Sequence, residues 1–530
     1  MTAGVIAAGD KETAAAGAEM LNRGGNAVDA AVAAAFASFI AEVGVVHLGG
    51  SGIAQIFDPR TNTSTVYDFF SAMPGLGGKL PKELDFAEVT IDFGPATQSF
   101  FLGRGSVAVP GNIAGLCAMS AEQGRLPLAV LLEPAIRLAE QRVSLAPFQA
   151  DTCRLLAPLY THTEGMRGVF APAGQIIAPG ERLFIPDLAD TLTSLAHEGA
   201  SYARTGRLAQ ALLADQTSHH GRLTALDLAS YEVLQSSPIR IVYRNHEVLL
   251  PSLSSAGGVL IAFSLELMTA IDMSGYRHGS ADHLRALYEI QAAVGHARNV
   301  WEDLAESLPG TEAVAHFLAE SFVGRYREEL RQSLADQKPS LAEAEPGGQS
   351  NTSHLSVMDD SGLAVSLTTT AGESAGYIVP GTGFIPNNML GEADLHPKGF
   401  HTRPAGQRIP TMMTPVIILR DGRPRLVVGS GGSIRIRSAI LQVLSNLLDF
   451  RFPLDQAVNL ARVHLEGGVL QCEAGYDPAA VDQLEAGGYP VNRWPGRSIY
   501  FGGAHSVARD EDGRLHAAGD NRRGGATAKV

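Results

Sequence analysis

The sequence has few of the residues that build disulfide frameworks, metal clusters or membrane spans. Only three of its 530 residues are cysteine (Cys117, Cys153 and Cys472), and none lies near a second cysteine or a histidine at metal-ligand spacing. No run of 18 or more apolar residues occurs, and the first residues do not form a basic segment followed by an apolar one. We therefore expect a reduced, cytoplasmic protein with no disulfide, no metal, no cofactor and no membrane partner.

Basic residues are also in short supply. Lysine and arginine together number 41 against 55 acidic residues, which gives a formal net charge of -14. A protein that binds nucleic acid needs a basic surface for the phosphates, so we expect no nucleic-acid partner. What the sequence does contain is 45% hydrophobic residues and 58 glycines, which indicates a globular protein with a large core and many tight turns.

The hydrophobic pattern divides the chain into a helix-rich part and a strand-rich part. Helical patterns cover residues 11–42 and dominate residues 185–335, with one β insertion near residues 240–252. Residues 336–351 hold two prolines, two glycines and a single large apolar residue, Leu341, so we predict a flexible linker there. Alternating strand patterns follow the linker. We expect one intertwined, layered α/β unit rather than separable domains.

A polar cluster, Asn351-Thr352-Ser353-His354, stands between this linker and the first of those strands. One interpretation is a polar strand start whose hydroxyl groups satisfy a turn, and composition alone favours it. The other is a nucleophile exposed by cleavage of the bond before Thr352. The new α-amine, with a pKa of about 7.7–8.0, would then serve as the base for the threonine's own hydroxyl.

Two neighbouring features favour the second interpretation. The cleavable linker ends directly before Thr352, and a threonine-rich strand, Thr368 to Thr370, is predicted to return beside it. In addition, the glycine-rich segment at residues 429–433 lies between a strand and a helix, where backbone N–H groups could point at an oxyanion. That segment could also be a simple tight turn.

The stretch "TSHLSVMDDSGLAVSLTTT" resembles the small-subunit signature of the γ-glutamyltranspeptidase family. Further blocks resemble the family in the same order, among them "GGNAVDAAVAAAFA", "VAVPGNIAGL", "PGTGFIPNN" and "GSGGSIRIRSAILQV", so that the resemblance covers about residues 4 to 526. It implies a four-layer αββα sandwich of the Ntn-hydrolase type, formed jointly by a large subunit (residues 1–351) and a small catalytic subunit (residues 352–530) cut from one precursor. A dimer of such pairs stays open.

The resemblance assigns a role to each residue that matches a family position. Thr352 falls on the nucleophile, whose α-amine acts as base, and Thr370 on the threonine whose hydroxyl bonds that amine. Gly432 and Ser433 fall on the paired glycines whose N–H groups form the oxyanion hole. A shift by one residue, to Gly431 and Gly432, is also compatible with the sequence.

The positions that bind the donor's carboxylate match the family only in part. Thr411 falls on the first of two serines that contact the α-carboxylate, but the second position is Met412. Lys79 stands where the family has an arginine. Lysine offers a point charge rather than a two-pronged donor, so we expect looser carboxylate binding.

The amino-group ligand departs further from the family. Its pattern N-N-[Glu/Gln]-M-D-D-F holds the γ-glutamyl amino group, but here the chain reads "NNMLGEADLHPKGF". Glu392 or Asp394 could replace the missing acidic residue only with different geometry. The asparagine expected two residues after Thr370 is Gly372. The chemistry is therefore expected to persist while the glutamyl clamp is largely lost.

Three hypotheses follow. The leading one is an autoprocessed amidohydrolase or acyltransferase of this family that cleaves a small-molecule acyl amide through an acyl-enzyme. The second is a true γ-glutamyltransferase or glutathione hydrolase with a relocated amino-group ligand. The third is an unprocessed, non-catalytic homologue that has kept the fold.

Overall fold

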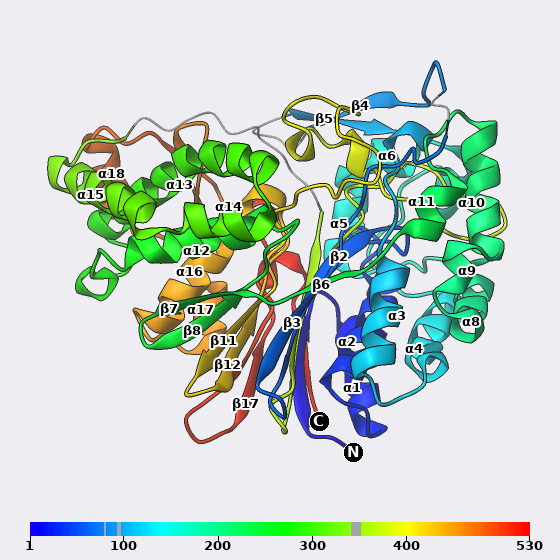
Figure 1. The fold of residues 1–530 in the computed structure, drawn as a ribbon, viewed down its shortest axis with the longest axis horizontal. Coiled ribbons are helices and arrows are strands. Elements are labelled where there is room, and N and C mark those ends of the chain that lie inside the picture. The colour runs from blue at the N-terminus through cyan, green and yellow to red at the C-terminus, as the bar shows by residue number, and fades with distance from the viewer. Residues whose placement is uncertain (79–80, 93–96, 341–350) are drawn as a thin grey trace.

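The chain folds into two facing antiparallel sheets with helices on both outer sides, as the computed structural model shows for residues 1–78, 81–92, 97–340 and 351–530 (Figure 1). The larger sheet has the strand order β18-β1-β9-β10-β2-β3-β6, and the smaller one the order β17-β16-β12-β11-β8-β7. This arrangement confirms the predicted four-layer αββα sandwich.

The strands of the two sheets have the following bounds: β1 Gly4–Ala8, β2 Ser51–Asp58, β3 Thr63–Phe69, β6 Leu234–Ser236, β7 Ile239–Tyr243, β8 His246–Leu250, β9 Ser353–Asp359, β10 Ala364–Thr370, β11 Val416–Arg420, β12 Arg423–Val428, β16 Ser506–Arg509, β17 Leu515–Ala518 and β18 Ala526–Lys529. Two small sheets lie outside the sandwich: β4 Ala87–Asp92 with β5 Thr97–Leu102, and β13 Val463–Glu466 with β14 Val469–Cys472 and β15 Val491–Arg493.

Helices α1 to α4 cover the larger sheet, whereas α12, α13 and α16 lie on the side of the smaller one (Figure 1). The helices are α1 Lys11–Asn22, α2 Ala27–Ala41, α3 Asn112–Gln123, α4 Leu128–Gln141, α5 Pro147–Leu155, α6 Ala157–Tyr160, α7 Glu164–Phe170, α8 Leu188–Glu198, α9 Ser201–Arg204, α10 Arg207–Ser218, α11 Ala225–Ser230, α12 Ala256–Met268, α13 Ala281–Ser307, α14 Gly310–Phe317, α15 Glu320–Asp336, α16 Ile436–Leu448, α17 Leu454–Asn459 and α18 Pro478–Ala486.

Helix α2 shows why the alanine-rich stretch near the start of the chain is so apolar. Every residue of Ala27–Ala41 is buried, because the helix is enclosed by β9, β10 and the neighbouring helices. Its start is fixed by Asn26, whose side chain accepts hydrogen bonds from the N–H groups of Val28 and Asp29. The small side chains of the helix let the backbones of the helix and the sheet approach closely.

The segments on either side of residue 351 share one core. Strands β9 and β10 lie in the middle of the larger sheet, between β1 and β2, and β11 pairs with β8 in the smaller one. Between the sheets, Val5 of β1 packs in the same apolar cluster as Met358 of β9 and Val427 of β12. The predicted linker begins where α15 ends, at Asp336, and its residues 341–350 lie outside the described residues. The division into subunits stays a prediction.

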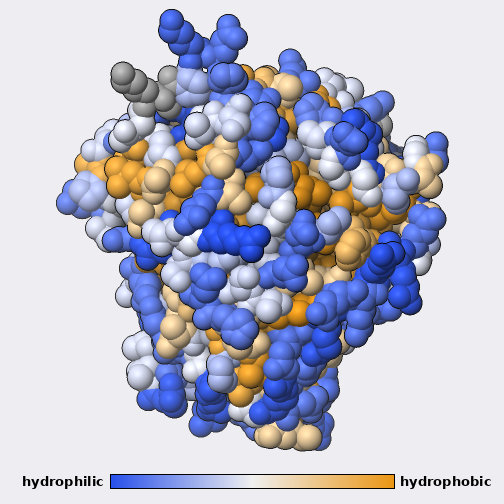
Figure 2. Space-filling view, turned by 90° about the vertical axis from the view of Figure 1, so that its right-hand side faces the viewer, coloured by the Kyte–Doolittle hydropathy of each residue, from blue (hydrophilic) through white to orange (hydrophobic). Residues whose placement is uncertain are grey.

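The outer helices present polar faces to solvent. Figure 2 looks onto the side of the molecule that carries α8 to α10, where hydrophilic residues predominate and apolar patches are interrupted. In α8 the apolar residues Leu188, Leu192 and Leu195 are buried against the layer beneath. Among the helices of the described ranges, none combines the length and the apolar character needed to cross a bilayer.

Candidate active site

Thr352 lies directly before β9, in the middle of the larger sheet, and its side chain is almost fully buried. Residue Thr369 of β10 pairs with Ser353, which brings Thr370 alongside Thr352 at the same end of the sheet. Thr352, Thr370 and Ser433 line one cavity of about 320 Å³. The structure therefore brings together these three predicted site residues from three segments of the chain.

Hydrogen bonds hold the residues on both sides of the peptide bond between Asn351 and Thr352. The hydroxyl of Thr370 donates to the carbonyl oxygen of Asn351 at 2.6 Å, and Arg523 Nη1 donates to the carbonyl oxygen of Thr352 at 3.1 Å. The family resemblance predicts a contact between Thr370 and the nucleophile's amine. In this uncut chain the nitrogen of Thr352 is still an amide, and the hydroxyl contacts the adjacent carbonyl instead.

The glycine-rich turn between β12 and α16 lies against Thr352. A Cβ atom on Gly431 would stand 2.0 Å from the carbonyl oxygen of Thr352, so only glycine allows this approach. Gly432 has a φ of +119° and Ser433 a φ of +50°, both in the left-handed region. The predicted oxyanion segment is therefore a strained turn next to the predicted nucleophile.

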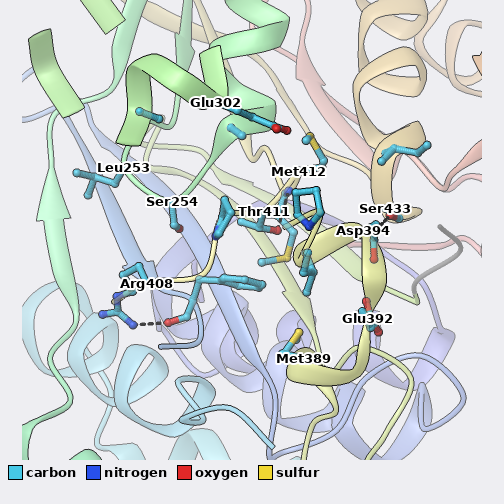
Figure 3. Close-up of a pocket in the computed structure, with 18 of the residues that line it drawn as sticks. Leu253, Ser254, Glu302, Met389, Glu392, Asp394, Arg408, Thr411, Met412 and Ser433 are labelled. Carbon is cyan, nitrogen blue, oxygen red and sulfur yellow. Dashed lines mark hydrogen bonds between the residues drawn. The ribbon is translucent and has the colours of Figure 1, made fainter. Parts of the chain in front are cut away.

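Two carboxyl groups line the same cavity. Asp394 accepts a hydrogen bond from the hydroxyl of Ser433, and Figure 3 shows these two side chains next to each other. The other oxygen of Asp394, Oδ1, is buried and has no hydrogen-bond partner among the described residues. Glu392 is also buried, and a Cβ on Gly372 would lie 2.4 Å from its Oε1. The carboxyl group of Glu392 thus occupies the space that a side chain at position 372 would need.

Methionines replace polar residues on the cavity wall. Met389 stands at the Glu/Gln position of the family pattern and Met412 at the second serine position, and both line the cavity (Figure 3). Thr411 lines it too, and its hydroxyl accepts from the N–H of Met413 at 3.2 Å. Lys79, the other carboxylate contact predicted in the sequence analysis, lies outside the described residues.

Cationic side chains around the cavity have partners of their own. Arg298 donates to Glu302 at 2.8 Å, and Lys398 forms an ion pair with Glu306 at 2.7 Å. Arg408 donates to backbone carbonyls, including that of Phe70, and lies at the opposite side of the cavity from Asp394 (Figure 3). The carboxylates neutralise the charges of Arg298 and Lys398, and the backbone carbonyls occupy hydrogen-bond donors of Arg408.

Two further buried carboxyl groups lie on either side of the bond before Thr352, and no motif or spacing in the sequence pointed to them. Glu373 contacts Asn351 on one side of the bond, and Glu42 contacts Ser353 on the other. The Glu42 carboxyl accepts from the Ser353 hydroxyl at 2.6 Å and from the Thr13 hydroxyl at 2.7 Å. Burial raises the pKa of Glu42 to about 7 against the opposing effect of these hydrogen bonds.

Glu42→Gln is expected to remove part of the pH dependence of stability. Because folding raises the pKa of Glu42 from 4.5 to about 7, the neutral carboxyl stabilises the folded state fully below pH 4.5, and this contribution is lost as the pH rises through 7. The loss amounts to at most about 3 kcal/mol. Denaturant unfolding of Thr352→Ala with and without Glu42→Gln, at pH 5 and pH 9, measures it. Equal pH dependence in both proteins would contradict the assignment.

Comparison with known proteins gives the family directly. The sequence profile described as gamma-glutamyltranspeptidase matches residues 13–530. The acylase ACY 1 proenzyme of Pseudomonas sp. (strain V22) is 33% identical over 521 residues, covering 97% of this chain and 91% of that protein. The glutathione hydrolase proenzyme of Escherichia coli (strain K12) is 28% identical over 545 residues, covering 98% and 90%.

A solved structure shows the same fold over nearly the whole chain. Cephalosporin acylase from Bacillus halodurans superimposes with a TM-score of 0.83 at 24% identity, covering 99% of this chain and 96% of that one. The family match and these relatives make the chain an enzyme that hydrolyses or transfers acyl groups at amide bonds, and the sandwich carries a threonine at the start of a central strand. The chain belongs to the gamma-glutamyltranspeptidase family.

Proposed function

We propose that the chain cuts itself between Asn351 and Thr352 and then hydrolyses or transfers small acyl groups other than γ-glutamyl. The observation that carries the choice of acyl group is the pair of methionines, Met389 and Met412, on the wall of the cavity that Thr352 also lines. They stand where the family resemblance expects polar side chains. An acyl group without an amino substituent fits such a wall better than a zwitterionic one. The acylase relative at 33% identity supports the same choice.

Self-cleavage would follow from the contacts of the scissile bond. The hydroxyl oxygen of Thr352 attacks the carbonyl carbon of Asn351, its proton passes to the amide nitrogen, and the C–N bond breaks to leave an ester. This step frees the α-amine of Thr352, and water then hydrolyses the ester to give a carboxylate on Asn351 and the free hydroxyl of Thr352. The hydroxyl of Thr370, 2.6 Å from the carbonyl oxygen, stabilises the negative charge that develops there.

Turnover would use the newly freed amine. The α-amine of Thr352 takes the proton of its own hydroxyl, whose oxygen attacks the substrate amide. The N–H groups of Gly432 and Ser433 stabilise the oxyanion, the amine product leaves with the proton, and water or another amine releases the acyl group. The alternative pair, Gly431 with Gly432, is less suitable because the N–H of Gly431 donates to the carbonyl oxygen of Gly503 at 3.4 Å.

A single comparison tests the proposed function. The purified enzyme, with its processing checked by denaturing mass spectrometry, is assayed with glutaryl and γ-glutamyl anilides that share one leaving group. A rate for the glutaryl substrate equal to or above that for γ-glutamyl supports the proposal. Thr411 and Lys79 remain as contacts for a carboxylate on the acyl group, so both substrates can be held at that end.

A specific observation also favours the second candidate, a glutathione hydrolase or γ-glutamyltransferase. Asp394 and Glu392 both reach the cavity, and the unpartnered Oδ1 of Asp394 could accept a hydrogen bond from the ammonium group of a γ-glutamyl donor. If this function holds, Asp394→Asn or Glu392→Gln will abolish a γ-glutamyl preference. A glutathione hydrolase among the relatives supports testing it.

A further inference from the structure

The carboxyl group of Glu373 forms two hydrogen bonds with Asn351, the residue that precedes the predicted nucleophile. Its Oε1 accepts from the backbone N–H of Asn351 at 2.9 Å, and its Oε2 accepts from the side-chain Nδ2 of the same residue at 2.8 Å. Both residues are buried. We propose that Glu373 is a positioning residue for self-cleavage, which holds Asn351 in the orientation that Thr352 requires for attack. This inference rests on the proposed self-cleavage.

The hydrogen bonds between Glu373 and Asn351 are part of a larger hydrogen-bonded arrangement at the end of β10. Thr370 bonds the carbonyl oxygen of Asn351 while Glu373, three residues later, bonds its N–H and its side chain. Asn388 fixes the turn itself, since its Oδ1 accepts from the N–H groups of Glu373 and Ser374 at 2.7 and 3.2 Å. Three hydrogen bonds from one turn thus fix a single residue, and this leaves its peptide carbonyl little freedom to rotate.

The charge environment of Glu373 depends on Asn351. Burial, with the nearby Asp394, raises the pKa of Glu373 to about 8, and the two donors of Asn351 and the guanidinium of Arg523 offset only part of this rise. A carboxylate in this position is therefore stabilised by the residue that it holds. Loss of the Glu373 carboxyl leaves the buried N–H of Asn351 without this acceptor, which is costly, while the side-chain amide of Asn351 keeps its bond to the carbonyl oxygen of Gly44 at 3.1 Å.

The rate of self-cleavage tests this role. Full-length chains from cell-free synthesis are followed by denaturing mass spectrometry as the uncut mass converts into two. We expect Glu373→Gln to slow cleavage about tenfold, since the amide keeps one acceptor, and Glu373→Ala to slow it about a hundredfold. Ser374→Ala, a control in the same turn whose hydroxyl oxygen accepts only from the N–H of Gly376, should stay within about twofold.

A double variant separates positioning from a general loss of stability. In Asn351→Ala the side-chain donor is absent, so Glu373→Gln should then cost less than about threefold. The thermal midpoints of all variants in the Thr352→Ala background control for folding. Cleavage of Glu373→Ala at the wild-type rate, or the same cost of Glu373→Gln in both backgrounds, would overturn the proposal. A wild-type chain that never cuts itself would instead refute the proposed function.

Discussion

Thr352→Ala is expected to leave one uncut chain with no measurable amidase activity. The substitution removes the single hydroxyl that attacks both the Asn351 carbonyl and the substrate, and it also keeps the amine from being released. Thr352 is buried, and alanine is smaller than threonine, so the fold should persist. Denaturing mass spectrometry distinguishes the mass of the whole chain from the masses of two pieces, and an anilide assay measures the loss of activity.

Thr352→Ser is the matched control, because serine keeps the hydroxyl and the amine while it removes only a methyl group. It should still cut itself and turn over substrate, although more slowly. If Thr352→Ala is nevertheless split between residues 351 and 352, another protease makes the cut. The contacts of Thr370 with Asn351 and of Arg523 with Thr352 would then serve only the fold.

The elements that position the site could be predicted because local patterns encode them. The alternation of "SHLSVMDD" and "GLAVSLTTT" became β9 and β10, and the alanine-rich stretch became α2. Thr352, Thr370 and Ser433 come together because β9 and β10 pair and the turn after β12 crosses their end. To predict that these residues come together, one needs to know only the order and the direction of the strands.

The partners of the scissile bond could not be predicted in the same way. Glu42 lies 311 residues before Ser353, and Arg523 lies 171 residues after Thr352, so no spacing in the sequence relates them. Glu373 is only three residues from Thr370, but its role depends on a turn whose shape is set by the distant Asn388. Buried hydrogen bonds of this kind depend on tertiary packing, which periodicity does not report.

Acidic side chains line the cavity, although the sequence led us to expect that the usual amino-group ligand is absent. Asp394 and Glu392 were considered as replacements with different geometry, and both line the cavity. Asp394 is engaged by the hydroxyl of Ser433 through Oδ2, and Glu392 is packed against Gly372. Both carboxyl groups therefore line the cavity, and each also contacts a neighbouring segment, Asp394 the oxyanion turn and Glu392 the end of β10.

A glutaryl anilide is expected to match or exceed its γ-glutamyl counterpart in kcat/KM. The two substrates differ only in the α-ammonium group, which must leave water and find a buried partner. An ammonium buried without a well-placed partner costs several kcal/mol, which corresponds to about a hundredfold or more in kcat/KM. Met389 and Met412 offer it no hydrogen bond, and Ser433 engages one oxygen of Asp394, which leaves only Oδ1 of that carboxyl for the ammonium.

The carboxylate end of the acyl group gives the matching variant test. Lys79→Ala should lower kcat/KM for glutaryl and γ-glutamyl donors and spare a neutral acyl donor such as a butyryl anilide, because only the first two carry the charge that Lys79 would bind. Lys82→Ala, in the same segment, is the control and should leave all three unchanged.

A strong γ-glutamyl preference that disappears in Asp394→Asn, but not in Asp360→Asn, would establish the second candidate instead. Asp360 is exposed at the far end of β9, so its loss removes an equal charge without touching the cavity.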